Sequence, residues 1–183
     1  MGLVVVKVGG SLYSLPGLGE RLRAFLATLA PDVPLVVPGG GPTTDAIRAY
    51  ARDQGLDASA AHWLALRACD VNAHLLAGLL GLPVAAWPHD RQAVLLPYSF
   101  AQGDEGSAGA LPHSWDATSD SVAARAAEVA GGWLVMLKST PMPPGLTWEE
   151  AARGGLVDPV LPVIVARAGL DARVVNMRPT NER

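Results

Sequence analysis

The chain has 183 residues, half of them hydrophobic and 17% charged, so it can form a single domain with a substantial core. Its net charge of −3 excludes a broad basic surface for nucleic acid, and no apolar run reaches the roughly 20 residues of a membrane span. A single cysteine, Cys69, excludes an internal disulfide bond and a thiolate metal cluster. The chain enters a hydrophobic run at once, without a signal-peptide pattern, so we expect a cytoplasmic protein.

Short runs rich in valine and leucine predict the strands. In chain order they cover residues 3–8, 35–37, 83–87, 94–96, 133–138, 160–165 and 173–175. Amphipathic or alanine-rich segments predict helices at residues 18–29, from 42, at 57–80, at 119–129 and from 147. Residues 98–111 are rich in glycine and polar side chains, which predicts a mobile loop.

The order of these elements indicates the fold class. Strands that alternate with helices are typical of an α/β protein, here a three-layer αβα sandwich around a mainly parallel sheet. Runs without polar alternation suit strands that are buried on both faces of such a sheet. The long helix at 57–80, which Asp57 caps and Gly81 ends, belongs either to the core or to a subunit interface.

Two glycine clusters follow two of the predicted strands and carry the strongest functional signal. The clusters are Gly9-Gly10-Ser11 and Gly39-Gly40-Gly41. Glycines at the carboxyl end of a parallel strand let backbone N–H groups approach an anion, because no Cβ stands in the way. Two such clusters indicate a site for two phosphate-bearing ligands, and therefore phosphoryl transfer. Neither the P-loop motif nor the dinucleotide-binding motif is present.

Two lysines stand at strand ends far apart in the sequence. Lys7 lies two residues before Gly9, and Lys138 follows an apolar run in the same way. A lysine in this position either reaches out to solvent or directs its charge at a phosphate that the glycine amides hold. Two such lysines can flank a transferring phosphoryl group from both sides.

Two aspartates, Asp116 and Asp120, lie four residues apart where a helix is predicted to begin. Acidic residues there either complement the helix dipole as caps or take part in the chemistry. In the functional interpretation, Asp120 bridges and orients the two lysines, while Asp116 contacts the acceptor.

Other side chains supply further candidates. His113 is either structural or in contact with the acceptor, and Arg48 is either a solvated helix residue or an anchor for an anionic acceptor. Trp115 stands where an aromatic acceptor could stack on it. We expect the remaining aromatic candidates to pack in the core or along the long helix: His62, His74, Trp63, Trp87 and Trp133. The histidine spacing fits no zinc site, so we expect no metal held by the protein alone.

This combination resembles the amino acid kinase superfamily, which includes acetylglutamate, aspartate, uridylate and isopentenyl phosphate kinases. The resemblance rests on the following residues in this order: Lys7, Gly9, Gly10, Ser11, Gly39, Gly40, Gly41, Asp120 and Lys138. It implies the carbamate kinase-like fold and a single domain over residues 1–183. Within it, residues 1–110 form an acceptor-binding lobe and residues 111–183 a shortened nucleotide-binding lobe.

The resemblance also implies roles for these residues, with ATP and Mg²⁺ as cofactors and the metal held mostly by the nucleotide. The implied catalytic residues are Lys7, Lys138 and Asp120. The implied nucleotide-binding residues are Gly9, Gly10 and Ser11, together with the two lysines. The implied acceptor-binding residues are Gly39, Gly40, Gly41, Arg48, His113 and Asp116.

Three stretches resemble one branch of the superfamily more closely. They are residues 39–48, 61–70 and 111–120. They are similar to the kinases of aminomethylfuran phosphomonoesters in methanofuran biosynthesis and to the bacterial relatives of those kinases. This resemblance implies a small-molecule acceptor that carries a phosphate, and a homo-oligomeric enzyme.

Two other functions stay open on the sequence. Only residues 139–183 follow Lys138, and the Asp-Gly pair that continues this strand in relatives is absent, which favours a non-catalytic subunit that binds a nucleotide or an anion. A kinase for uridylate or a carboxylate would share the catalytic set and differ at the acceptor-binding positions. The intact catalytic set favours an enzyme, since a binding protein does not need an aspartate that orients lysines.

Overall fold

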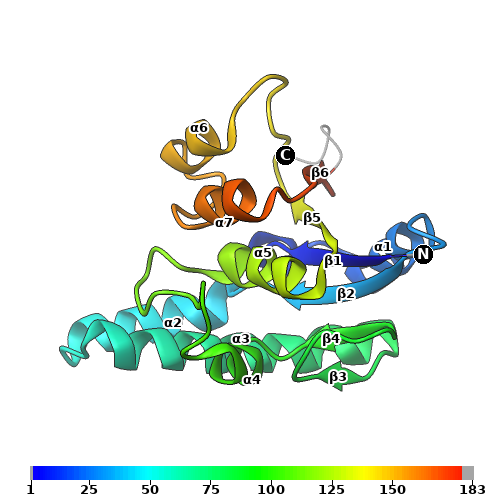
Figure 1. Cartoon of the computed structure of the whole chain (residues 1–183). Coiled ribbons are helices and arrows are strands. Elements are labelled where there is room, and N and C mark those ends of the chain that lie inside the picture. The colour runs from blue at the N-terminus through cyan, green and yellow to red at the C-terminus, as the bar shows by residue number, and fades with distance from the viewer. Residues whose placement is uncertain (1, 179–183) are drawn as a thin grey trace.

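A parallel β-sheet forms the centre of the computed structural model, which describes residues 2–178 (Figure 1). The strands are β1 (Leu3–Val8), β2 (Val33–Pro38), β3 (Val84–Ala85), β4 (Ala93–Leu95), β5 (Trp133–Lys138) and β6 (Ala172–Asn176). Their order across the sheet is β3-β4-β2-β1-β5-β6, and every neighbouring pair is parallel. The carboxyl ends of all these strands therefore share one edge, with β1 between β2 and β5.

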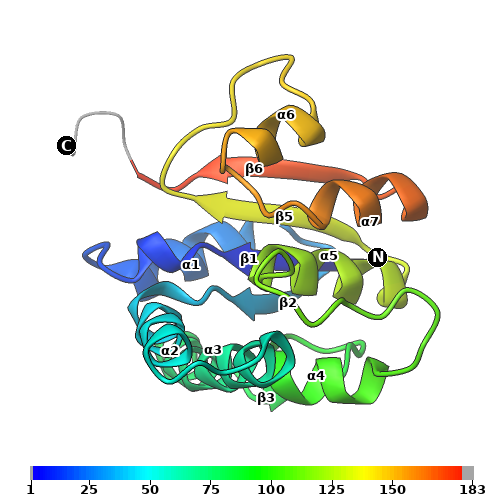
Figure 2. The ribbon, with the colours of Figure 1, turned by 90° about the vertical axis from the view of Figure 1, so that its left-hand side faces the viewer.

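Helices cover both faces of the sheet, which confirms the predicted three-layer α/β architecture (Figure 2). They are η1 (Gly10–Leu12), α1 (Leu18–Ala27), α2 (Gly41–Asp53), α3 (Ala58–Leu80), α4 (Pro97–Asp104), α5 (Ser119–Ala130), α6 (Trp148–Arg153) and α7 (Leu161–Ala168). Helices α5 and α7 pack on one face, and α1 and α3 pack on the other. Within residues 2–178, no helix is long and apolar enough to cross a membrane.

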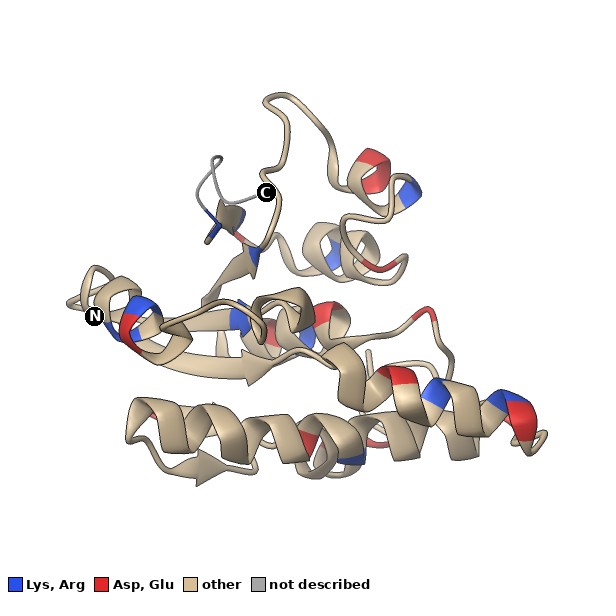
Figure 3. Cartoon of the chain, turned by 180° about the vertical axis from the view of Figure 1, so that it is seen from behind, with Lys and Arg blue, Asp and Glu red and all other residues tan. Residues whose placement is uncertain are grey.

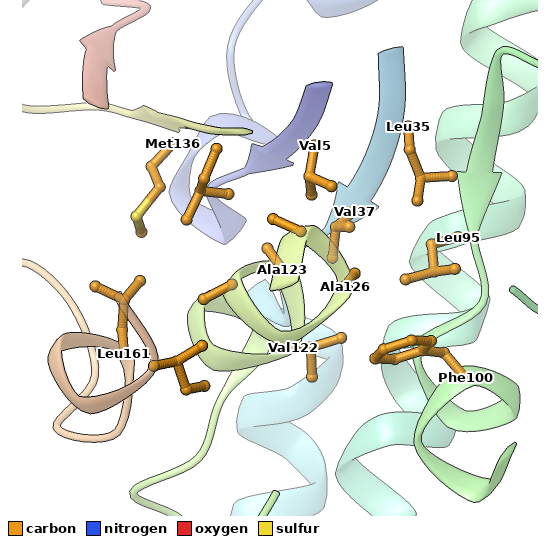
Figure 4. Packing of buried hydrophobic residues seen from close by; sticks show 14 of the residues in the cluster. Val5, Leu35, Val37, Leu95, Phe100, Val122, Ala123, Ala126, Met136 and Leu161 are labelled. Atoms are coloured by element: carbon orange, nitrogen blue, oxygen red, sulfur yellow. The ribbon is translucent and has the colours of Figure 1, made fainter. Parts of the chain in front are cut away.

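The valine run of β1 shows why its sequence lacks polar alternation. Val4 and Val6 pack in the core cluster with α1 and α3, whereas Val5 packs in the opposite cluster, shown in Figure 4. In that second cluster Ala123 and Ala126 of α5 face the sheet, and Val122 lies beside Phe100. Because both faces are covered, each side chain of a central strand is buried whichever way it points.

Local signals for the helix ends are confirmed. The side chain of Asp57 accepts a hydrogen bond from the N–H of Ala60 and caps α3, and Gly81 ends that helix in the left-handed conformation. Thr147 and Glu150 form the predicted capping box of α6. These motifs depend only on residues within one helical turn, so the sequence predicts them well.

Two predicted elements are wrong. The expected loop at 98–111 contains α4, because its apolar side chains, among them Phe100, are buried and Asp104 pairs with the buried Arg125. The expected strand at 160–165 is α7. Its buried residues Leu161, Ile164 and Val165 follow helical spacing, and Pro162 suits the first turn of a helix.

Two aromatic residues also depart from their expected positions. Trp87 is 41% exposed, with its ring centroid 5.1 Å from that of Phe100, so it lies at the rim of the core. His74, expected to pack along the long helix, is exposed on α3.

Candidate active site

Three charged side chains meet at the carboxyl ends of β1 and β5. Nζ of Lys7 lies 2.5 Å from Oδ1 of Asp120 in an ion pair, and Nζ of Lys138 donates a hydrogen bond of 2.7 Å to Oδ2. The side chains of Lys7, Asp120 and Lys138 are only 5%, 6% and 13% exposed. These are the only two lysines in the chain. Burial excludes a solvated Lys7 and a solvated helix cap at Asp120.

Strand register and the packing of α5 bring the three charges together. Lys7 pairs with Met136 across the β1–β5 ladder, and Met136 lies two residues before Lys138. Because alternate residues of a strand share a face, both lysines point to the same side of the sheet as Val5. That side is covered by α5, whose first turn contains Asp120.

Burial and neighbouring charges shift the protonation of this cluster. Burial acts to raise the pKa of Asp120, but Lys7 and Lys138 outweigh it and hold that pKa below its usual range. Burial and the charge of Lys7 lower the pKa of Lys138 to about 8, although Asp120 opposes the shift. With both lysines protonated the cluster carries one excess positive charge, which can stabilise a phosphoryl group in transfer.

A buried carboxylate that the sequence analysis did not single out holds the start of α5. Oδ2 of Asp158 accepts hydrogen bonds of 2.9 Å from the N–H groups of Thr118 and Ser121. Oδ1 accepts hydrogen bonds of 3.1 and 2.9 Å from the N–H groups of Val160, the residue before α7, and Leu161, its first residue. Asp158 therefore joins the two helices and fixes the turn that carries Asp120. The Asp-Pro pair, which is typical of a turn, is the only signal for it in the sequence.

The two glycine clusters pack directly against each other. A Cβ atom on Gly10 would lie 2.3 Å from the nitrogen of Gly41, and one on Gly39 would lie 2.5 Å from the nitrogen of Gly10. Gly41 also has a φ of +53°, which favours glycine. The first N–H groups of α2 have no partner inside the helix, so this end can hold an anion.

A buried amide anchors the second glycine cluster, and the sequence analysis did not predict it either. Nδ2 of Asn72 donates hydrogen bonds to the carbonyl oxygens of Gly39 at 2.8 Å and Gly40 at 2.6 Å. Its Oδ1 accepts a hydrogen bond of 2.9 Å from the Thr43 hydroxyl, and the Tyr13 hydroxyl donates to Gly39 at 2.7 Å. These bonds fix the position of the turn against α3 and Tyr13.

A pocket of about 230 Å³ lies beside the glycines, between α2, α3 and the loop before α5. The guanidinium of Arg48 lies over the ring of Trp115, 4.6 Å from the ring centroid, and both residues line the pocket. Asp45 adds a carboxylate to the lining, and α2 carries charges of both signs along its length (Figure 3). The pocket thus combines an arginine, a carboxylate and an aromatic ring within one small volume.

Three predicted acceptor-binding residues, Gly39, His113 and Asp116, lie outside the lining of this pocket. Asp116 is exposed. Nδ1 of His113 lies 2.8 Å from the Ser59 hydroxyl and Nε2 lies 3.2 Å from a carboxylate oxygen of Glu105. These contacts tie the loop before α5 to α3 and to the residue after α4. His62, expected to pack along its helix, stacks on His113 and lines the pocket, where burial and His113 lower its pKa.

The first glycine turn is joined to the end of β5. The hydroxyl oxygens of Ser11 and Ser139 lie 2.9 Å apart, and Ser139 directly follows Lys138. The N–H of Gly9 donates a hydrogen bond of 2.8 Å to the carbonyl of Leu137. The structure therefore places all predicted nucleotide-binding residues within one connected edge of the sheet.

Known proteins share this sequence pattern and this fold. The amino acid kinase family matches residues 2–141 of the chain. Uridylate kinase of Hyperthermus butylicus is 30% identical over 205 aligned residues, which include 96% of this chain and 89% of that protein. The structure superposes on uridylate kinase of Archaeoglobus fulgidus with a TM-score of 0.62 and 20% identity, over 94% of this chain and 90% of the other. UMP kinase of Bacillus anthracis gives a TM-score of 0.65 and 15% identity, over 97% and 88%.

The fold and these matches define the protein as a phosphotransferase that acts on a small molecule. The chain belongs to the amino acid kinase family, in agreement with the resemblance seen in the sequence.

Proposed function

We propose that the protein transfers the γ-phosphoryl group of ATP to a small phosphomonoester. The observation that carries this proposal is the buried Lys7–Asp120–Lys138 cluster at the strand ends, beside two glycine turns. A protein that only binds an anion has no need for a carboxylate that holds two buried lysines at fixed positions. The enzyme is therefore favoured over a non-catalytic subunit.

The proposed reaction needs no covalent intermediate with the enzyme. An oxygen of the acceptor phosphate forms a bond to the γ-phosphorus as the bond to the β–γ bridging oxygen breaks, and ADP leaves with that electron pair. Lys7 and Lys138 stabilise the charge on the transferring group and on the leaving oxygen. Asp120 keeps both lysines in place, so they need no reorganisation during transfer.

Each of the two glycine turns binds one of the two proposed ligands. Gly9, Gly10 and Ser11 bind the nucleotide phosphates, and the second cluster, Gly39–Gly41, binds the acceptor phosphate together with the start of α2. In this division residues 1–110 form the acceptor lobe and residues 111–183 the nucleotide lobe.

Mg²⁺ fits this site as a companion of the nucleotide. No group of three or more His, Cys, Asp or Glu side chains in residues 2–178 could hold a metal ion. Both carboxylate oxygens of Asp120 face lysines. Mg²⁺ bound to phosphate oxygens would neutralise part of their charge, and it keeps water ligands readily.

An aminomethylfuran phosphomonoester is the acceptor that we propose. The pocket offers a guanidinium for its phosphate at Arg48, a ring for stacking at Trp115 and a carboxylate for its ammonium group at Asp45. His113 and Asp116, which lie outside the lining, belong to the loop before α5 that would close over the acceptor. Uridylate is the second candidate acceptor, and the named uridylate kinase relative supports it.

The test begins with calorimetric titration of the protein with Mg·ATP, followed by assays of ADP release with each acceptor. We expect release that depends on the aminomethylfuran phosphomonoester, with little release in the presence of uridylate. A preference for uridylate would contradict the proposed acceptor but would still support the proposed kinase activity. Folded protein that binds no Mg·ATP would support the non-catalytic subunit.

A further inference from the structure

The segment after β6 returns to the edge of the sheet that contains the site. Strand β6 runs parallel to β5, with Asn176 in register with Lys138. The N–H of Met177 donates a hydrogen bond of 2.9 Å to the carbonyl oxygen of Lys138. The next residue, Arg178, therefore lies near the carboxyl end of β5, the strand that ends in Lys138.

The side chain of Arg178 crosses from there to the first glycine turn. Its Nη2 donates hydrogen bonds to the carbonyl oxygen of Ser11 at 3.0 Å and to the hydroxyl of Ser14 at 2.8 Å. Ser11 in turn contacts Ser139 at the end of β5. Three distant parts of the chain thus meet around the turn that we propose for the nucleotide phosphates.

Among the residues that the structure describes, the guanidinium of Arg178 has an unused donor and no counter-charge. Its Nε–H is buried and forms no hydrogen bond with the residues that the structure describes. No carboxylate within residues 2–178 forms an ion pair with it, and both of its acceptors are neutral oxygens. Arg178 is half-buried, and a buried donor without a partner is costly. A phosphate offers two oxygens to the guanidinium fork, so it is the ligand that matches best.

We infer that Arg178 binds the polyphosphate chain of ATP, as a third cation beside Lys7 and Lys138. This inference rests on the proposed function, because it takes the turn at Gly9–Ser11 as the nucleotide turn. Arg178 contacts Ser11 and Ser14 in and after that turn, whereas the two lysines lie at the strand ends. It therefore positions the nucleotide, while the lysines act on the transferring group.

A purely structural Arg178 would only hold the segment after β6 against the first glycine turn. This structural role and the phosphate-binding role predict different effects on stability and on ligand affinity. Loss of a tether lowers stability and affects all ligands alike. Loss of a phosphate-binding guanidinium weakens ligands that carry phosphates and leaves adenosine unaffected. It also raises KM for ATP more than it lowers kcat, because the transferring group keeps both lysines.

The test compares Arg178→Gln with wild-type protein and with Arg173→Gln. Arg173 lies on β6, the strand that precedes Arg178, and its guanidinium packs over the ring of Trp133, 4.6 Å from the centroid. Each protein is titrated with Mg·ATP, tripolyphosphate and adenosine. We expect Arg178→Gln to bind ATP and tripolyphosphate about 10- to 100-fold more weakly, and Arg173→Gln to stay within about twofold of wild type.

The outcomes separate this inference from the proposed function. Wild-type protein that binds neither ATP nor tripolyphosphate would overturn both. Wild-type binding of ATP that Arg178→Gln retains in full would overturn the inference alone. If Arg178→Gln does not fold, Arg178→Lys decides, because lysine keeps the charge and loses the fork. We then expect about a threefold or greater loss of ATP affinity, and unchanged affinity would overturn the inference.

Discussion

Lys7 and Lys138 share one carboxylate but differ in exposure. Lys7 is 5% exposed and lies within β1, whereas Lys138 is 13% exposed and ends β5. Burial and the charge of Lys7 lower the pKa of Lys138 to about 8. With the pKa of Lys138 at about 8, we expect the charge of the site to depend on pH and on the presence of an anionic ligand.

Replacement of either lysine by alanine tests its assigned role. We expect Lys7→Ala and Lys138→Ala each to lower the rate of phosphoryl transfer by about 10²- to 10⁴-fold, the scale for loss of a preorganised charge. Steady-state assays with circular dichroism as a control for folding provide the measurement. A folded variant with an unchanged rate would exclude that lysine from the chemistry.

The pKa of Lys138 predicts a dependence on pH. The ammonium form is lost as pH rises through about 8, so kcat/KM for ATP should fall above that pH. Bound phosphates favour the charged form of Lys138 and raise its pKa. Because kcat reports the ligand-bound enzyme and kcat/KM the free enzyme, kcat should stay high to a higher pH than kcat/KM.

Amine labelling followed by mass spectrometry measures this titration directly, because Lys7 and Lys138 are the only lysines. Modification of Lys138 should rise around pH 8 in the folded protein and only near 10.5, its ordinary pKa, in urea. A midpoint near 10.5 in both states would contradict the shift.

At the scale of elements, the site depends on contacts between backbone segments. The loop after β1 and the start of α2 approach so closely that Gly10 has no room for a side chain. Asn72 of α3 holds the second turn through hydrogen bonds to the carbonyl oxygens of Gly39 and Gly40. Both proposed ligand-binding turns are therefore tightly packed at the edge of the sheet. This packing fixes the distance between the two proposed phosphate sites.

Alanine at Gly10 tests this packing. We expect Gly10→Ala to separate the turns and to abolish measurable binding of ATP or acceptor, because its Cβ would lie 2.3 Å from the nitrogen of Gly41. Gly78→Ala is the matched control, since that helical position of α3 has open space. It should bind normally and raise the free energy of unfolding by about 0.5–1 kcal/mol. Equal behaviour of the two variants in calorimetry would contradict the argument.

The link between α5 and α7 is tested at Asp158. We expect Asp158→Asn to lower the free energy of unfolding by about 2 kcal/mol or more, because four backbone N–H groups share that carboxylate. Turnover should fall as well, since the turn that carries Asp120 loosens. Asp171→Asn, at an exposed position, should change neither urea denaturation nor turnover. A stable Asp158→Asn with normal turnover would show that Asp120 needs no such support.

At the scale of the whole molecule, one face of α3 stays apolar and exposed. Leu64, Val71, Leu75 and Leu79 are 36% to 61% exposed and recur at helical spacing along one side. A surface stripe of this kind is typical of an interface between proteins. It supports the homo-oligomer that the resemblance implies, with a second copy of the chain as the partner.

Oligomerisation can be tested with a matched pair of substitutions. Val71 of α3 and Val163 of α7 are both 61% exposed. We expect Val71→Glu to shift the protein to a monomer in analytical ultracentrifugation, because the charge would be buried at the interface, and Val163→Glu to leave the assembly intact. A monomeric wild-type protein would contradict the expected homo-oligomer.

The sequence by itself determined most of the strands, the capped helices and the proposed catalytic set, because these depend on patterns within a few residues. Lys7 and the glycines after it belong to one such pattern, and the family match confirms the class of enzyme that it indicated. Only the tertiary structure decided that α4 and α7 are helices, since burial against α5 overrides their local composition. It also decided the parts played by Asn72, Asp158 and Arg178, because their partners lie far away along the chain. A polar residue shows its role only when folding brings its partners within hydrogen-bond distance.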